Sequence, residues 1–388
     1  MSKKTINLIV SKIRFVIGKG SHQLHEPLFL GNEKKYVRDT IEKNFVSSAG
    51  KYVDKFEHKF KNYVKSKYAV AVVNGTQALF ISLKVCGVSR NDEVLMPALT
   101  FVGTANAVNY LGAKPHFIDS DISTLGVNCL KLDNYLKKIT KIKNGKCINK
   151  ITGNKIKAII PVHVFGHPSD IENILLIAKK YKLKVIEDAA EALGSYYKKK
   201  HLGTFGEIGC FSFNGNKIIT TGGGGMVVSN KKNLAKKIKH LTTTAKLKHR
   251  WEYIHDEVGF NFRMPNINAA LGLAQMEKIN IFLKAKRALF RKYQSVFKNI
   301  KEISIFKEPP NSKSNYWLQT IILTPKFKKN KDLLIKRLNG KKIFSRPVWK
   351  LLSELKPYKK CSRMNLSGSK DIYERSINIP SSQYLELK

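Results

Sequence analysis

A lysine close to a run of glycines is the residue whose setting most suggests covalent chemistry in this sequence. Lys217 follows an apolar segment at residues 211–213, lies five residues after Ser212 and precedes four consecutive glycines at 222–225. A lysine amine reacts with carbonyl groups when a desolvated or electropositive pocket keeps it deprotonated. The arrangement fits an amine that closely approaches a cofactor while the Ser212 hydroxyl binds a phosphate.

The glycine run matches neither of two common nucleotide-binding motifs. No Gly-Lys-Ser or Gly-Lys-Thr follows it, so it is not a P-loop. It precedes the apolar segment MVVS at 226–229 instead of opening a helix, so it is not the dinucleotide-binding fingerprint either.

A second candidate site lies where Asn74, Gly75 and Thr76 follow the apolar run YAVAVV. A glycine turn and a hydroxyl at the start of a helix present backbone N–H groups and a favourable dipole to a phosphate. The same residues also make an ordinary strand-to-helix turn with an N-cap. Taken alone, this segment leaves both interpretations open.

A third candidate is Asp188, which ends the apolar run KVIED at 184–188. A carboxylate at the end of a strand can hold a proton on a heteroaromatic nitrogen through a charge-assisted hydrogen bond. It could equally be a metal ligand or a helix N-cap.

Alternating strands and helices are predicted to position these groups. Apolar runs at 68–73, 93–97, 114–119, 157–162 and 184–188 alternate with helical patterns that begin near Thr76, Val102 and Ser169. Such alternation predicts an α/β fold with a mostly parallel sheet covered on both faces. Ligands of these sheets bind beyond the carboxyl ends of the strands, where the three candidates lie.

The C-terminal part of the sequence reads as a smaller α+β domain. A helical pattern begins near Lys231 and a long one runs from about Asn268 to Phe297. Strand candidates follow at 316–323 and 341–348, with helices near Asp332 and Asp371. The Lys-rich stretch 137–157 reads as a polar insertion loop.

The high positive charge does not by itself decide the class of function. The chain of 388 residues has a formal net charge of +43, which fits nucleic acid, an anionic membrane surface or a polyanionic substrate. The lysines are spread along the whole chain and do not alternate with aromatic residues, as a base-stacking surface requires. We therefore expect no nucleic-acid partner.

The cysteines and the N-terminus indicate a cytoplasmic protein. The five cysteines are odd in number and contain no C-x-x-C pair, which favours free thiols. Lys12, Arg14 and Lys19 interrupt the apolar N-terminal residues before a membrane span or signal segment forms. We expect a short surface helix there and no membrane insertion.

Seven stretches in this sequence, taken in order, resemble the DegT/DnrJ/StrS family of sugar aminotransferases. They are FVSSAGKYVDKFE, VNGTQALFISL, DEVLMPALTFVGTANAVNYLGAKPHFID, IIPVHVFGHPSDI, VIEDAAEALGS, HLGTFGEIGCFSFNGNKIITTGGGGM and GFNFRMPNINAALGLAQ. The resemblance runs from about Glu26 to the C-terminus. It implies the aspartate aminotransferase fold, which is fold type I of the pyridoxal 5′-phosphate (PLP) enzymes. We divide the chain into an N-terminal extension (1–25), a PLP-binding large domain (26–265), and an interdomain helix with the small domain (266–388).

The resemblance also implies roles for individual residues. Lys217 matches the lysine that binds PLP covalently, and Asp188 matches the partner of the pyridine nitrogen. The remaining matches are Glu191 near the phenolic oxygen of PLP, Gly75, Thr76 and Ser212 at its phosphate, and Phe101 stacked on its ring. Asn261 and Arg263 in GFNFRMP match a segment that reaches the phosphate of the neighbouring subunit, which implies a homodimer with shared active sites.

Three further residues are candidates for contact with the substrate. His163 and His167 lie four apart, but Gly166 and Pro168 disfavour a helix, so we expect no metal site there. His163 is instead expected to shape the floor or substrate side of the cleft. Arg346 and Trp349 could bind the nucleotide sugar by charge and stacking, although a surface arginine and a packed tryptophan explain them equally well.

The implied reaction is the transfer of an amino group from an amino acid, expected to be L-glutamate, to C4 of a 4-keto-6-deoxy nucleotide sugar. The family commonly has GEGG after the lysine, where this sequence has four glycines, and this difference affects the finer substrate assignment. NGNKIITTGGGGM and SRPVWK resemble the subgroup acting on UDP-2-acetamido-2,6-dideoxy-hexos-4-ulose, in surface polysaccharide or nonulosonic acid biosynthesis, on routes to bacillosamine or legionaminic acid.

Three alternatives remain. A PLP-dependent sugar dehydratase on the same fold replaces the lysine with histidine, which Lys217 argues against. A nucleic-acid or anionic-surface binding protein has no need for Lys217, Asp188 and a phosphate turn in this order. A regulatory relative that keeps PLP without turnover is distinguished only by an activity measurement.

Overall fold

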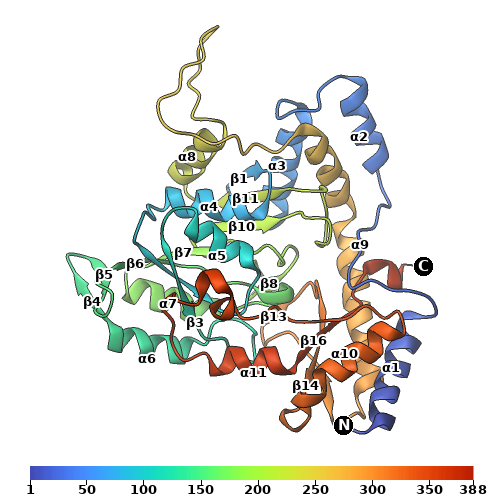
Figure 1. Ribbon diagram of the computed structural model, residues 1–388. Helices are drawn as coiled ribbons and strands as arrows, with labels where there is room; N and C mark the ends of the chain where they lie inside the picture. Colours follow the sequence, from blue (N-terminus) through green and yellow to red (C-terminus); the bar gives the residue numbers. More distant parts are fainter. Residues whose placement is uncertain (388) are drawn as a thin grey trace.

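A large, mostly parallel sheet forms the centre of the protein (Figure 1). The computed structural model describes residues 1–387. Neighbouring strands follow the order β1-β11-β10-β7-β6-β2-β3, in which β10, β7, β6, β2 and β3 run parallel while β11 is antiparallel to both β1 and β10. The strands are β1 (Tyr68–Val72), β2 (Glu93–Pro97), β3 (Lys114–Ile118), β6 (Lys155–Ile159), β7 (Lys184–Asp188), β10 (Ile208–Ser212) and β11 (Gly225–Ser229).

Helices cover both faces of this sheet, as the alternating sequence pattern predicts. One face packs against α4, α5 and α8, and the other packs against α3, α6, α7 and the long helix α9. Because both faces are covered, the strand residues are almost all buried and read as continuous apolar runs. The helices are α3 (Lys51–Val64), α4 (Gly75–Val85), α5 (Val102–Asn109), α6 (Cys129–Ile139), α7 (Ile171–Lys180), α8 (Lys232–Thr242) and α9 (Asn266–Phe297).

The stretch 137–157 is not a polar loop, contrary to the expectation from its composition. It contains a hairpin of β4 (Thr140–Lys143) and β5 (Lys146–Asn149), and β5 continues the central sheet by pairing antiparallel with β6. Asn144 and Gly145 form the turn with φ of 50° and 68°. An Asn-Gly pair with two positive φ values is the preferred two-residue hairpin turn, a signal outweighed in the sequence by the surrounding lysines.

The small domain contains an antiparallel sheet in the order β12-β14-β16-β15. Its strands are β12 (Ile303–Ile305), β14 (Gln319–Leu323), β15 (Arg346–Pro347) and β16 (Ser376–Ile379), and its helices are α10 (Lys331–Gly340) and α11 (Ser367–Arg375). A third sheet joins β13 (Ser312–Lys313) to β8 (Tyr196–Tyr197) and β9 (Lys200–His201) of the large domain. The sheet β13-β8-β9 therefore connects the two domains.

The N-terminal helix packs its apolar face against the small domain and α9. Helix α1 (Lys3–Ile17) buries Ile9 and Ile13 completely in an apolar cluster that includes Leu289 and Tyr293 of α9. The helix is amphipathic with a basic outer face, which is why the sequence alone suggested a surface helix. Helix α1 therefore packs with the small-domain residues, and the domain division at residue 25 stays a prediction.

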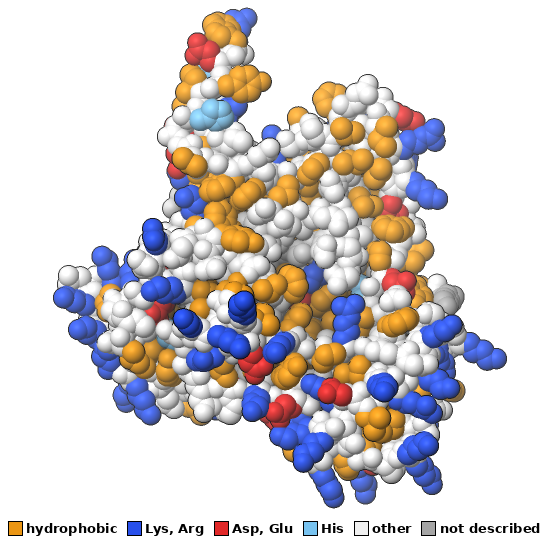
Figure 2. Space-filling view, viewed as in Figure 1, with side chains coloured by type: hydrophobic (Ala, Val, Ile, Leu, Met, Phe, Trp, Pro, Cys, Tyr) orange, Lys and Arg blue, Asp and Glu red, His pale blue; other side chains and the backbone are white. Residues whose placement is uncertain are grey.

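Two surface features follow from the chain path. After α8, residues 244–258 project from the body with Trp251 and Tyr253 exposed (Figure 1). Figure 2 shows lysine and arginine side chains gathered over the lower half of the visible face, while the upper half is mostly apolar or uncharged. Helix α2 (Glu33–Glu42) packs on α9 in this upper region.

Among the described residues, no helix has the length and apolar character needed to cross a membrane.

Candidate active site

A cavity of about 360 Å³ lies between the two domains, at the carboxyl ends of the parallel strands. The large domain contributes the ends of β7 and β10 and the starts of α4 and α5, whereas the small domain contributes Trp317, Arg346 and Trp349. Predicted site residues that line the cavity are Gly75, Thr76, Phe101, Asp188, Glu191, Ser212, Lys217, Arg346 and Trp349. Three sequence signals from separate elements therefore meet in one place.

Asp188 ends β7 and presents a nearly buried carboxylate to the cavity. Its Oδ2 accepts a hydrogen bond from the Thr104 hydroxyl at 2.8 Å, and its Oδ1 accepts one from the backbone N–H of Ala190 at 3.2 Å. Burial raises the pKa of Asp188, and the two hydrogen bonds oppose this effect. A protonated ring nitrogen placed beside this group would favour its carboxylate form, as an opposite charge does.

Lys217 projects its amine between a carboxylate and an aromatic ring. Its Nζ lies 3.2 Å from Oε1 of Glu191 and 3.8 Å from the ring centroid of Trp317. The other oxygen of Glu191 accepts a hydrogen bond from the backbone N–H of Phe165 at 2.8 Å. Burial raises the pKa of Glu191. The nearby Lys217 amine and the Phe165 N–H lower this pKa, but by less than burial raises it. The amine of Lys217 is therefore directed into the cavity by two partners.

The start of α4 and the end of β10 form a compact polar pocket at the base of the cavity. The Asn74 side chain caps α4 by accepting a hydrogen bond from the N–H of Gln77 at 2.8 Å, which leaves the N–H groups of Gly75 and Thr76 at the helix start. A Cβ on Gly75 would lie 2.9 Å from Cβ of Ser212. Only glycine therefore lets the helix N-terminus and the Ser212 hydroxyl approach each other this closely.

A second glycine serves the same pocket. A Cβ on Gly103 would lie 2.8 Å from Oγ1 of Thr76 and 3.1 Å from the ring of Phe101. The absence of that atom lets α5 pass close to both side chains. Phe101 is 57% exposed, so its ring is free to contact a flat ligand.

The groups in the cavity fit PLP. The amine of Lys217 can bind the aldehyde of PLP, and the Asp188 carboxylate can bind the ring nitrogen of PLP. The ring of Phe101 can stack on one face of the pyridine. The helix start with two hydroxyls, from Thr76 and Ser212, suits its phosphate.

His163 does not line the cavity, and its predicted role at the floor or substrate side of the cleft stays a prediction. The ring is fully buried, with Nε2 3.1 Å from Oε2 of Glu187 and Nδ1 accepting a hydrogen bond from the N–H of Ser169 at 3.2 Å. His167 points elsewhere and bonds the hydroxyl of Ser314 at 2.9 Å. His163 lies behind the β7 end that carries Asp188.

Asn261 and Arg263 lie outside the cavity of their own chain. Asn261 is exposed, and Arg263 pairs through its backbone with Val72 at the end of β1. The side chain of Arg263 lines a basic hollow with Lys239, Thr243, Lys246, Leu247, Lys248, His249 and Arg250. Its buried Nε has no hydrogen-bond partner among the described residues. A role across a subunit interface stays a prediction.

Sequence reasoning missed Thr104 and Trp317. Thr104 lies one helical turn after Phe101, where its hydroxyl reaches Asp188, but a threonine inside an apolar helix gave no signal. Trp317 was assigned only to a strand candidate, because its place next to Lys217 depends on how the two domains pack. Neither contact could be found from local spacing.

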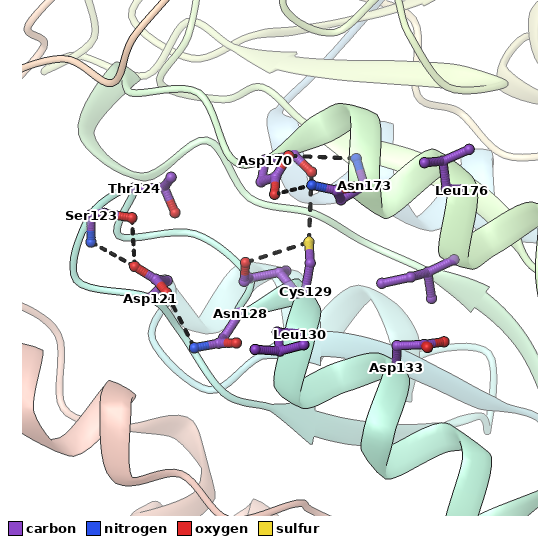
Figure 3. Close-up of a pocket in the computed structure, with 12 residues that line it drawn as sticks. Asp121, Ser123, Thr124, Asn128, Cys129, Leu130, Asp133, Asp170, Asn173 and Leu176 are labelled. Carbon is purple, nitrogen blue, oxygen red and sulfur yellow. Dashed lines mark hydrogen bonds between the residues drawn. The ribbon is translucent and has the colours of Figure 1, made fainter.

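Another hollow, of about 410 Å³, lies between α6 and α7 and lacks these features (Figure 3). Its polar groups serve the local backbone: Asp121 accepts hydrogen bonds from Ser123 and Asn128, and Asp170 caps α7 at Asn173. Burial raises the pKa of the Cys129 thiol, which disfavours its reactive thiolate form. This hollow contains no residue that the sequence singled out.

Comparison with known proteins agrees with the geometry. Residues 30–388 match the model of the DegT/DnrJ/EryC1/StrS aminotransferase family. GDP-perosamine synthase of Escherichia coli O157:H7 is 40% identical over 359 residues, which covers 92% of each chain. UDP-4-amino-4,6-dideoxy-N-acetyl-beta-L-altrosamine transaminase of Campylobacter jejuni (strain 81-176) is 32% identical over 348 residues, 89% of each chain.

Among solved structures, Helicobacter pylori PseC, an aminotransferase involved in the biosynthesis of pseudoaminic acid, superposes with a TM-score of 0.83 at 26% identity and covers 93% of this chain and 94% of its own. The fold, the cavity and the matches along nearly the whole chain agree. The chain belongs to the DegT/DnrJ/EryC1/StrS aminotransferase family and is a PLP-dependent sugar aminotransferase.

Proposed function

We propose that this enzyme transfers an amino group from L-glutamate to C4 of a 4-keto-6-deoxyhexose carried on a nucleoside diphosphate. The observation that carries the proposal is the convergence of Lys217, Asp188 and the phosphate pocket on one cavity, which continues to Arg346 and Trp349 of the small domain. The guanidinium of Arg346 makes no hydrogen bond or ion pair within residues 1–387 and is available for an anionic substrate.

Each residue has a distinct task in this proposal. Bound PLP supplies the electron sink that labilises a C–H bond next to the transferred nitrogen. Lys217 Nζ takes the proton from the α-carbon of the donor and, in the second half of the cycle, delivers a proton to C4 of the sugar. The Asp188 carboxylate holds the proton of the ring nitrogen. Glu191 keeps the released amine directed into the cavity.

Sequence similarity favours a guanosine nucleotide over the uridine nucleotide expected from the motifs. The relative named GDP-perosamine synthase is 40% identical, whereas the transaminase named for a UDP sugar is 32% identical over a similar length. We therefore propose a GDP-linked 4-keto-6-deoxyhexose as the first acceptor. UDP-2-acetamido-2,6-dideoxy-hexos-4-ulose is the second candidate, which the sequence motifs and the second relative support.

Product analysis tests both parts of this proposal. Purified protein with PLP and ¹⁵N-labelled L-glutamate is incubated with GDP-linked and UDP-linked 4-keto-6-deoxy sugars, and products are analysed by mass spectrometry. We expect a labelled 4-amino sugar with the GDP substrate, and a lower kcat/KM with the UDP substrate. Transfer only to the UDP sugar would reverse the nucleotide assignment. No labelled sugar from either substrate would contradict the proposed activity.

A further inference from the structure

Trp317 contacts the site lysine from the other domain. The residue lies two positions before β14 of the small domain, is 4% exposed, and places its ring centroid 3.8 Å from Nζ of Lys217. A cation over the face of an indole ring is attracted by the ring quadrupole, most strongly where water is excluded. The ring therefore gives the flexible lysine side chain a preferred position.

The same side chain also fixes the backbone that carries the lysine. The indole N–H of Trp317 donates a hydrogen bond to the backbone carbonyl of Asn216 at 2.6 Å. Asn216 immediately precedes Lys217 in a turn that has no strand or helix pairing of its own. Trp317 therefore contacts the lysine amine through its ring face and the main chain of the preceding residue, Asn216, through its N–H.

Trp317 is itself held rigidly in place. Its backbone N–H donates to Oδ1 of Asn315 at 2.8 Å, and its carbonyl accepts from the buried amine of Lys286 at 2.7 Å. Asn315 also donates to the carbonyl of Glu191 at 2.7 Å. The two partners of the Lys217 amine, Glu191 and Trp317, are therefore connected through one asparagine.

We propose that Trp317 is a positioning residue for Lys217. While the lysine is not covalently engaged, the ring and Glu191 hold its amine in the cavity, where it can carry a proton to and from a bound substrate. The inference rests on Lys217 being the reactive lysine and is independent of the sugar and the nucleotide. It also makes the lysine position depend on the packing of the small domain against the large one.

Labelling of the cofactor-free protein tests this proposal without relying on turnover. Trace acetic anhydride is applied near neutral pH, and acetylation of Lys217 is measured by peptide mass spectrometry relative to the exposed Lys370. The ring covers one side of the amine and holds it in place, so loss of the ring should make the amine more accessible and increase labelling. For Trp317→Leu we expect about threefold or greater labelling of Lys217. For Trp317→Phe, which keeps an aromatic face, we expect a smaller increase.

A second tryptophan provides the matched control. Trp349 lines the same cavity and packs against Phe165 in a tilted arrangement, with ring centroids 4.8 Å apart, but makes no ring contact with Lys217. Trp349→Leu widens the cavity and should leave Lys217 labelling unchanged. Equal increases in Trp349→Leu and Trp317→Leu, or wild-type labelling in Trp317→Phe, would overturn the proposal. If Trp317→Leu does not fold, the Trp317→Phe result decides the proposal.

Kinetics of the PLP-loaded protein provides a second, separable measurement. A positioning role predicts that Trp317→Leu lowers kcat about tenfold or more while KM for the sugar changes little, because the loss lies in the proton-carrying step. Trp317→Phe should recover part of kcat. A change in KM alone would assign Trp317 to sugar binding and overturn the positioning role. Failure of the sugar assignment would leave the labelling result unaffected.

Discussion

The amine of Lys217 and the carboxylate of Glu191 lie 3.2 Å apart, although they follow different strands of the central sheet. Glu191 is fixed by the N–H of Phe165, a residue held at a φ of 54°, where bulky side chains are rarely found. The hydrogen bond to Glu191 helps to hold this conformation. The strained turn at Phe165 thus contacts the buried carboxylate that lies against the reactive amine. Strained backbone conformations are often found at active sites.

Asp188→Asn should bind PLP yet lose most activity. A neutral amide cannot hold the proton on the ring nitrogen as a carboxylate does, so we expect kcat to fall about a hundredfold or more. Thr104→Val is the matched control: it removes one hydrogen bond but keeps the carboxylate, and should cost about tenfold or less. Steady-state kinetics with a PLP absorbance titration checks both variants. An unchanged kcat in Asp188→Asn would refute the assigned role.

Arg346 is predicted to bind the anionic part of the nucleotide sugar. It lines the cavity without an internal partner, so Arg346→Met should raise KM for the nucleotide sugar about tenfold or more and change the unfolding free energy little. Arg346→Lys keeps the charge without the guanidinium geometry, and its KM should lie between those of wild type and Arg346→Met. Identical KM values in all three proteins would show that the arginine serves another purpose.

The active species is predicted to be a homodimer whose sites share residues. Asn261 is exposed and the Nε of Arg263 has no partner among residues 1–387, as expected for groups completed by a second subunit. Co-expression of Lys217→Ala with the double variant Asn261→Ala/Arg263→Ala should restore activity, because one site in each heterodimer has a complete set of residues.

Each variant expressed alone provides the control for this complementation and should be inactive or nearly so. Light scattering at assay concentration gives the oligomeric state in parallel. A fully active monomer, or no recovery in heterodimers verified by two affinity tags, would contradict the shared site.

Lys286 is predicted to make stability depend on pH. Complete burial lowers the pKa of Lys286 well below its ordinary value, and its amine hydrogen-bonds the carbonyls of Trp317 and Ser381. The unfolded chain therefore binds a proton that the folded chain lacks, between the lowered pKa and about 10.4. Folding must remove this proton, and the cost of removing it falls as the pH rises toward the pKa of the unfolded lysine. The free energy of unfolding should therefore rise with pH across this window.

Urea unfolding of wild type and Lys286→Met between pH 7.5 and 9.5 measures this effect. The free energy of unfolding of wild type minus that of Lys286→Met should increase by up to about 1.4 kcal/mol per pH unit. Lys370→Met, which removes an exposed lysine, should run parallel to wild type. Parallel curves for all three proteins would show that Lys286 is not neutral in the folded state. His25, also buried nearby with a pKa lowered well below its ordinary value, titrates below this range.

Much of the large domain was predictable because its signals are local. Apolar runs gave β1, β2, β3, β6 and β7, and both faces of the sheet are covered as their uniform burial requires. The same runs placed Asp188 and Thr76 at strand and helix ends, where open α/β sheets bind ligands. Lys217 and Ser212 were found in the same way, since both lie within or just after one strand.

The errors arise where long-range packing decides the structure. Helix α1 has a basic outer face that resembles a surface helix, but Ile9 and Ile13 pack against α9, almost three hundred residues later. The polarity of the lysines masked the Asn144-Gly145 hairpin. Trp317 meets Lys217 only after the two domains pack.

Reduction of the PLP-loaded protein with borohydride, followed by peptide mapping, tests the central claim most directly. Borohydride makes the link between the cofactor and its lysine permanent, so the modified residue can be identified by mass. We expect one phosphopyridoxyl group per chain, on the peptide containing Lys217, and none in Lys217→Ala, which should be folded by circular dichroism and inactive in transamination. Label on another lysine, or near wild-type turnover in Lys217→Ala, would contradict the account.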